Sequence, residues 1–171
     1  MIARRPAVAG SFYPAQPDRL RQQVVELLSD AETALKITPK ALIAPHAGYI
    51  YSGSPAAAAF ATLRDSEQTL TRIVLIGPAH YVAIRGIALP TVDAFETPLG
   101  RVSVDHGALN EITGLPFVSR NDAAHAPEHN CRFCRLCCYR SHWCRLLSVT
   151  PLHTRSRKCW RGYGPALKRC C

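Results

Sequence analysis

Cysteine and tryptophan are absent from residues 1–129, and acidic residues are absent from residues 130–171. The first segment contains 11 lysines and arginines and 12 acids, whereas the second contains 10 basic residues, all eight cysteines and both tryptophans. The chain's net charge of +9 therefore comes entirely from residues 130–171. A basic balance confined to one short segment does not indicate a nucleic-acid-binding body, so we expect no nucleic-acid partner for residues 1–129.

Long apolar runs are also lacking. No stretch approaches the roughly 20 apolar residues needed to span a membrane, and the N-terminus, MIARRPAVAGSFYPAQP, lacks the apolar segment of a signal peptide. A body without cysteine is typical of cytosolic proteins. We therefore expect a cytoplasmic protein without a membrane partner, and the length of 171 residues predicts a single domain.

Residues 1–129 alternate between helical and strand patterns. Apolar residues of 17–35 recur at helical spacing, and Ser54-Pro55 has the residue types of a helix start ahead of the alanine-rich segment 56–62. Short apolar or alternating runs predict strands at 41–44, 73–76, 86–90 and 101–105, with FETPLG connecting the last two. Apolar strands separated by helices predict an α/β fold with a mostly parallel sheet and flanking helices.

Two histidines occupy equivalent places in this pattern. His46 in IAPHAG and His80 in IGPAH each follow an expected strand and a proline. The carboxyl ends of parallel strands are where ligands bind in such sheets, so the two imidazoles are expected to converge on one metal ion or substrate. For either histidine alone, a hydrogen bond within its turn would be the favoured explanation, whereas the two together favour a site.

Further polar residues could line a pocket. Tyr49, Tyr51 and Ser52 follow His46, although buried packing explains tyrosines equally well. Near the end of the body, NDAAHAPEHN holds four residues with acid, base or ligand chemistry, for which a solvated loop is the alternative; they are Asp122, His125, Glu128 and His129. His106 is expected at the surface.

Five ordered motifs give the chain a specific resemblance. VAGSFYP, APHAGYIYSG, IGPAHY, ETPLG followed by VSVD, and the EH of APEH occur in the order and spacing typical of the Memo family. The bacterial members of this family are called AmmeMemoRadiSam system protein B. Residues 4–129 resemble the family nearly end to end.

This resemblance carries several implications. The family's fold is similar to that of class III extradiol dioxygenases, which are non-haem iron enzymes. His46 and His80 match two of the family's metal ligands, and Glu128-His129 match its pocket motif. Iron or copper is the implied metal, and other AmmeMemoRadiSam system proteins are the implied partners. Whether the family is enzymatic is unsettled.

The resemblance stops after His129. A Ser-Leu-Glu-Val-Gln-Leu-Pro-Phe-Leu type segment, a Val-Pro-Leu-Val-Val-Gly strand, a Ser-Ser-Asp-x-x-His motif and a late cysteine would follow in the family, and none is visible here. Yet when codons are rebuilt from the third base of each codon and the next two bases, HNCRFC permits Gln-Leu-Pro-Phe-Leu. In the same way, residues 143–151 permit a Val-Pro-x-x-Val-Gly-Asp-Ala strand end. We hypothesise that a frameshift, with the loss of a few codons, created residues 130–171.

The sequence thus predicts two regions. Residues 1–129 would form the N-terminal part of a Memo-like α/β domain, and residues 130–171 a non-native, disordered tail. The expected function is that of a metal-binding, dioxygenase-like protein, left incomplete or inactive because the family's segments after His129 are lost. The alternative is a zinc or nucleic-acid module in the tail, where CxxCxxCC precedes His142, Cys144 and His153, although no clear second CxxC pair is present.

Overall fold

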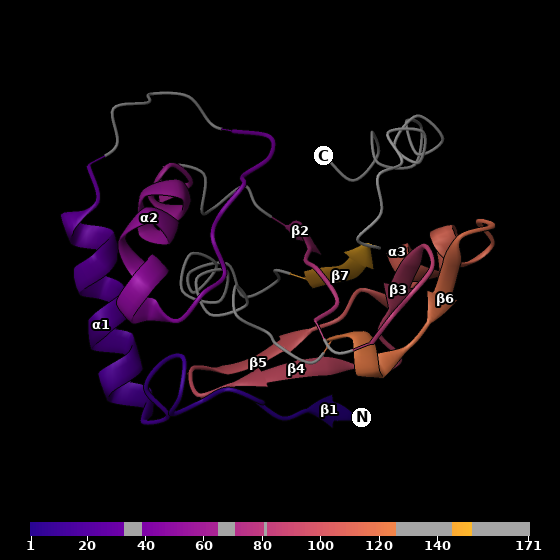
Figure 1. Ribbon diagram of the computed structural model, residues 1–171, viewed down its shortest axis with the longest axis horizontal. Coiled ribbons are helices and arrows are strands. Elements are labelled where there is room, and N and C mark those ends of the chain that lie inside the picture. Colours follow the sequence, from indigo (N-terminus) through magenta and orange to yellow (C-terminus); the bar gives the residue numbers. More distant parts are fainter. Residues whose placement is uncertain (33–38, 65–70, 81, 126–144, 152–171) are drawn as a thin grey trace.

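The computed structural model describes residues 1–32, 39–64, 71–80 and 82–125, together with the backbone of 145–151 (Figure 1). Its elements follow the chain in this order: β1 (Ala3–Arg4), α1 (Pro17–Asp30), α2 (Tyr49–Ala61), β2 (Arg72–Ile76), β3 (Ile87–Leu89), β4 (Ala94–Thr97), β5 (Gly100–Ser103), α3 (His106–Thr113), β6 (Val118–Arg120), the 3-10 helix η2 (Asp122–His125) and β7 (Arg145–Pro151).

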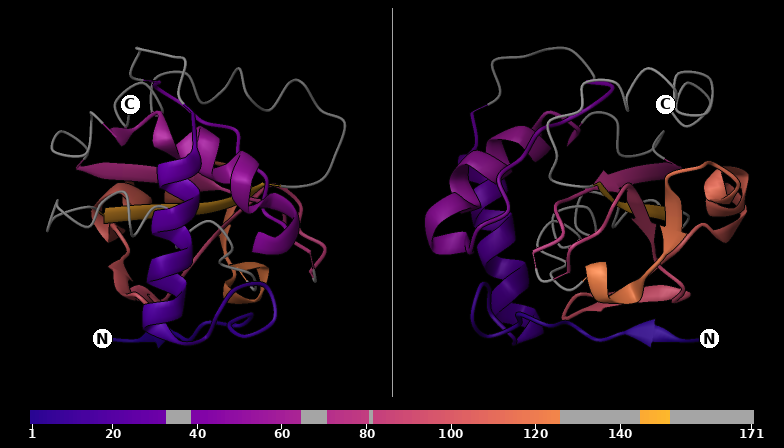
Figure 2. Two further views of the ribbon diagram at one scale, coloured as in Figure 1. Left: turned by 90° about the vertical axis from the view of Figure 1, so that its left-hand side faces the viewer. Right: turned by 45° about the vertical axis from the view of Figure 1, so that its right-hand side comes forward.

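Helices α1 and α2 pack side by side at one end of the molecule (Figures 1 and 2). Leu20 and Val24, one turn apart on α1, are fully buried against Ala57 and Phe60 of α2. Gly53 lets the helices approach closely, because a Cβ atom there would lie 3.0 Å from a methyl group of Leu27. Helix α1 ends at Asp30 rather than continuing to the predicted residue 35.

Helix α2 begins at Tyr49, five residues before the predicted start at Ser54-Pro55. The backbone N–H of Tyr49 donates to the carbonyl oxygen of Phe12 at 2.9 Å, which fixes the first turn through a contact distant in sequence. Pro55 lies inside the helix, where the ring costs one backbone hydrogen bond. A tertiary contact therefore overrides the local start signal.

A three-stranded sheet lies nearest the N-terminus, in the order β1-β4-β5. Strand β1 pairs parallel with β4, and β4 forms an antiparallel hairpin with β5 through a turn ending at Gly100, which has a φ of 119°. The sequence analysis predicts a connection at FETPLG, and this was wrong, because residues 95–97 belong to strand β4 and Gly100 already belongs to β5. The prediction of a strand at 101–105 is confirmed by β5.

A four-stranded sheet has the order β2-β7-β3-β6. Strand β7 pairs parallel with β2 and antiparallel with β3, and β3 pairs parallel with β6. The predicted strands at 73–76 and 86–90 are confirmed as β2 and β3. Leu89, Phe95, Val102 and Leu109 form a core that joins strands of both sheets to α3.

The chain is thus a mixed α/β protein, as predicted, but the described strands form two mixed sheets rather than a single mostly parallel one. Residues 145–151 form the strand that joins β2 to β3, within the segment for which disorder is predicted. The other residues of 130–171 lie outside the described part, so the division at residue 129 stays a prediction. Across the described residues, no helix is both long enough and apolar enough to cross a membrane.

Candidate functional site

His46 and His80 face each other although 34 residues separate them in the sequence. Their Nε2 atoms lie 3.0 Å apart, and the ring centroids are 5.1 Å apart. His46 is half-buried and His80 is exposed, so the pair is open to solvent. The structure therefore brings together the two imidazoles that the sequence singled out.

The two histidines reach this place from different kinds of segment. His80 follows β2, as predicted, after residues 77–79, which have no regular secondary structure. His46 precedes α2, but residues 41–44 have no regular secondary structure, so the predicted strand there was wrong. Burial alternates along this segment, with Leu42 and Ala44 packed on the helix core and Ile43 99% exposed. The alternation gave the run a strand-like pattern without a strand partner in the described part of the chain.

The distance between the two Nε2 atoms suits a shared metal ion. Two imidazole nitrogens bound to one ion at about 2.0–2.1 Å each lie roughly 2.9–3.4 Å apart, depending on the angle at the metal. The same distance also suits an N–H···N hydrogen bond between neutral rings, one as donor and the other as acceptor. Both arrangements use neutral imidazole, the form that binds iron, copper and zinc.

The described residues supply only part of a metal site. Among residues 1–32, 39–64, 71–80 and 82–125, no group of three or more histidine, cysteine, aspartate or glutamate side chains is arranged to hold a metal. Glu128 and His129, predicted to belong to the pocket, lie outside the described residues. Two imidazoles without a third protein ligand leave at least two coordination positions open to solvent.

The other predicted pocket residues occupy the first turn of α2. Tyr49 is buried, and its ring lies 6.3 Å from that of Tyr13 in the helix core, which matches the packing alternative. Tyr51 is 82% exposed. Ser52 is buried, and its hydroxyl donates to the carbonyl oxygen of Ala47 at 2.8 Å. Ser52 thus ties the residue after His46 to the helix, and its place in a pocket stays a prediction.

Replacing Ser52 with alanine is expected to lower the free energy of unfolding by about 1 kcal/mol, because the Ala47 carbonyl loses its hydrogen bond. Denaturant titration measures the change. Ser54→Ala, at an exposed position of the same helix, is the matched control and should change stability by no more than about 0.5 kcal/mol. Equal effects of the two substitutions would contradict this role for Ser52.

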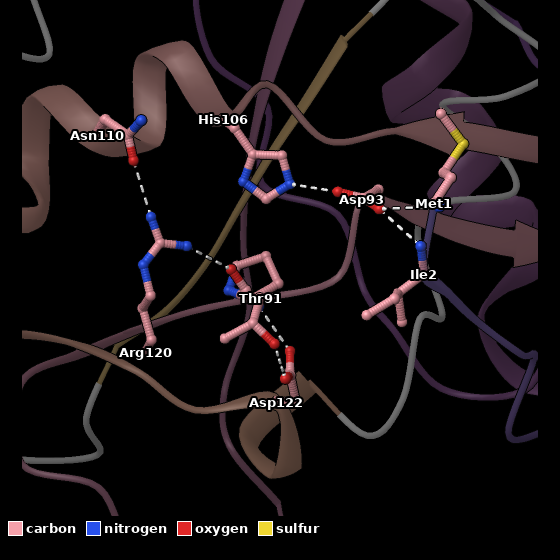
Figure 3. Close-up of polar contacts among 9 residues, drawn as sticks. Met1, Ile2, Thr91, Asp93, His106, Asn110, Arg120 and Asp122 are labelled. Carbon is pink, nitrogen blue, oxygen red and sulfur yellow. Dashed lines mark hydrogen bonds and ion pairs between the residues drawn. The ribbon is translucent and has the colours of Figure 1, made fainter.

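A second polar cluster surrounds η2 and includes Asp122 and His125. The backbone N–H of Thr91 donates to Asp122 at 2.7 Å, and the Thr91 hydroxyl also donates to this carboxylate (Figure 3). Burial raises the pKa of Asp122, but the Thr91 hydrogen bonds, one from the Val92 backbone and the charge of His125 together lower it. Asp122 is therefore ionised and anchors η2 to the end of β3.

His125 is buried, with its ring 6.2 Å from that of Phe95. Burial lowers the pKa of His125 to about 4, and the positive charge of Arg4 adds to this effect. The charge of Asp122 and a hydrogen bond with the Ala88 backbone oppose it. His125 is therefore neutral near pH 7 and acts as a packed core residue. The solvated-loop alternative for this part of the cluster was wrong.

Several residues that make polar contacts near α3 belong to no sequence motif, so the sequence analysis did not find them. Asp93 lies 3.3 Å from His106 and accepts a hydrogen bond from the Ile2 N–H at 2.6 Å, which joins the N-terminal segment to α3 (Figure 3). Arg120 contacts Asn110 and the carbonyl oxygen of Pro90 (Figure 3). These residues meet only because α3 packs on strands and loops that are distant in the sequence, so their sequence positions alone carry no signal. His106 is about one third exposed, near the surface as predicted.

The sequence is similar to known proteins of one family. The profile of the family described as "Memo-like protein" matches residues 4–141, which extends past the predicted boundary at 129. A MEMO1 family protein of Aquifex aeolicus is 38% identical over 130 residues, covering 76% of this chain and 47% of that protein. Protein MEMO1 of Xenopus laevis is 40% identical over 116 residues, covering 67% and 38%. A MEMO1 family protein of Pyrobaculum arsenaticum is 44% identical over 119 residues, covering 66% and 42%.

Fold and site together define a mixed α/β protein with a solvent-open pair of facing histidines. The chain belongs to the Memo family. It spans about half or less of the length of the curated relatives that it matches.

Proposed function

We propose that the chain carries one part of a metal site, in which His46 and His80 hold iron or copper. The observation that supports this is the 3.0 Å distance between their Nε2 atoms, in a pair open to solvent. Imidazole nitrogen is a good ligand for both metals. Membership of the Memo family agrees with the proposal, because the resemblance implies a metal ligand at each of these two positions.

The chain's own residues would position the ligands and leave room around them. Residues 77–79 carry His80 beyond the end of β2, and the hydrogen bond from Ser52 to Ala47 holds the segment that carries His46. Bound iron or copper would supply Lewis-acid or redox chemistry at its open positions, as in the class III extradiol dioxygenases that the family resembles. Two imidazoles alone would bind either metal weakly and below one equivalent.

We further propose that the remaining ligands are absent because the chain leaves the family's reading frame after His129. The support is the codon pattern of residues 129–134 and 143–151 together with the partial coverage of the relatives. Sequencing the gene tests this. A shifted frame that does not continue past codon 171 into a Ser-Asp-x-x-His segment would contradict it.

Calorimetric titration with Cu²⁺ tests the metal site, after alkylation of the eight cysteines, all of which lie in residues 131–171. We expect weak, substoichiometric binding that His46→Ala or His80→Ala abolishes and His106→Gln leaves intact. One tight site would contradict an incomplete set of ligands, and binding unchanged in both alanine variants would contradict the site itself.

Zinc analysis before and after alkylation addresses the tail module. Zinc that co-purifies with the chain and is lost on alkylation would favour the cysteine-rich tail as a binding module, because thiolates are its main candidate ligands. We expect no stoichiometric zinc in either sample.

A further inference from the structure

Helix α2 contains no charged residue. Its sequence, YIYSGSPAAAAFA, packs one face on α1 and leaves the other exposed. The exposed residues, called here the outer face of α2, are Ile50, Tyr51, Ser54, Pro55 and Ala58. Ile50 is 86% exposed and Tyr51 is 82% exposed. A helix without charge on any face is typical of one buried on all sides.

The neighbouring helix α1 shows that the lack of charged residues is particular to α2. Helix α1 packs on the same core, yet its exposed residues include charged side chains along its whole length, namely Asp18, Arg19, Glu26 and Asp30. Single exposed apolar residues are ordinary on protein surfaces. An uncharged surface extending along one helix, next to a helix with a charged surface, indicates an interaction site.

The chemistry of the outer face selects the kind of partner. A nucleic acid or an anionic lipid surface requires lysine or arginine side chains, and the outer face of α2 has none. An apolar polypeptide surface is the complementary partner. A source of such a surface exists in the relatives, because more than half the length of the Aquifex aeolicus, Xenopus laevis and Pyrobaculum arsenaticum proteins lies outside the region that matches this chain.

We propose that the outer face of α2 is the docking surface for the half of a Memo-family domain that this chain does not match. In a full-length relative, that half belongs to the same polypeptide and is available to cover the corresponding helix within each molecule. In this chain the face is exposed, and it accepts the unmatched half when that half is supplied as a separate polypeptide. The inference does not depend on a metal ion, so it stands apart from the proposed function.

Co-expression tests the proposal. The full chain, carrying an affinity tag, is produced together with the unmatched half of the Aquifex aeolicus MEMO1 family protein and purified in buffer containing EDTA. We expect a soluble 1:1 complex by size-exclusion chromatography with light scattering. Ile50→Glu and Tyr51→Glu should each lower the amount of co-purified half at least about tenfold, because each places an unpaired charge in an apolar contact.

Val25→Glu is the matched control, since Val25 is an apolar residue of α1 that is 49% exposed. It should leave co-purification within about twofold of the unsubstituted chain, and circular dichroism should show the same helix content in all three variants. A half that stays insoluble or fails to co-purify overturns the proposal, as does equal loss in all three variants. A homodimer of this chain that Ile50→Glu disrupts and the half does not displace would identify a second copy as the occupant, and would also overturn it.

Discussion

Gly86→Ala is expected to lower the free energy of unfolding by at least about 3 kcal/mol. Gly86 has a φ of 99°, which L side chains rarely adopt, and an added Cβ atom would lie 2.1 Å from the carbonyl oxygen of Phe117. That oxygen cannot move away freely, because it accepts the hydrogen bond from the Ile87 N–H at 2.7 Å. The substitution therefore strains the point where β3 starts to pair with β6.

Gly114→Ala is the control for this experiment. Gly114 has a φ of −79°, and in the described part of the chain an added Cβ atom would have no heavy atom within 4 Å beyond those of its own helix end and adjacent residues. Its effect on stability should stay within about 0.5 kcal/mol. Chemical denaturation of both variants decides the matter. Similar unfolding midpoints for the two would show that the turn before β3 differs from the one described.

Acidification from about pH 6.5 to about pH 4 is expected to remove up to about 3 kcal/mol of stability through His125. Burial and the charge of Arg4 lower the pKa of His125 in the folded chain from 6.5 to about 4. Within this window the unfolded chain binds a proton at His125 and the folded chain does not, so the folded state loses stability as pH falls. Asp122, whose pKa is lowered from 3.8, acts in the same direction but mainly below about pH 4.

Denaturation curves measured at intervals between pH 4 and pH 7 test this prediction. His125→Gln removes the titrating group, so the variant should show a shallower dependence of the unfolding free energy on pH, whatever its stability at pH 7. His106→Gln, at a position about one third exposed, should retain the dependence. An unchanged slope in His125→Gln would mean that other groups cause the acid sensitivity.

Local sequence patterns predicted the elements that local interactions determine. Strands β2 and β3 coincide with apolar runs that end in Gly, Pro or both, so the sequence predicted where both strands lie. The apolar residues of α1 recur at helical spacing, which predicted this helix in the same way. The start of α2 could not, because it depends on the contact between Tyr49 and Phe12. The pairing of β7 between β2 and β3 was equally hidden, since nothing in RLLSVTP specifies its neighbours.

The same distinction holds for the site. His46 and His80 could be singled out because each stands in a proline-containing turn after an apolar run, and the structure does place their imidazoles together. The buried hydrogen bond from Ser52 to Ala47 could not be read from the sequence, because it depends on α2 starting earlier than predicted. The hydrogen bonds from Thr91 to Asp122 link residues that only the packing of η2 against β3 brings together.

Electron paramagnetic resonance of Cu²⁺ added to the alkylated chain tests the two-histidine site most directly, because nitrogen ligands split the copper signal. Simulation of the spectrum should require two imidazole nitrogens, one from His46 and one from His80, consistent with their facing Nε2 atoms. His46→Ala and His80→Ala should each abolish the protein-bound signal, while His106→Gln leaves the spectrum unchanged. Spectra of both alanine variants identical to that of the unsubstituted chain would contradict a metal site at this pair.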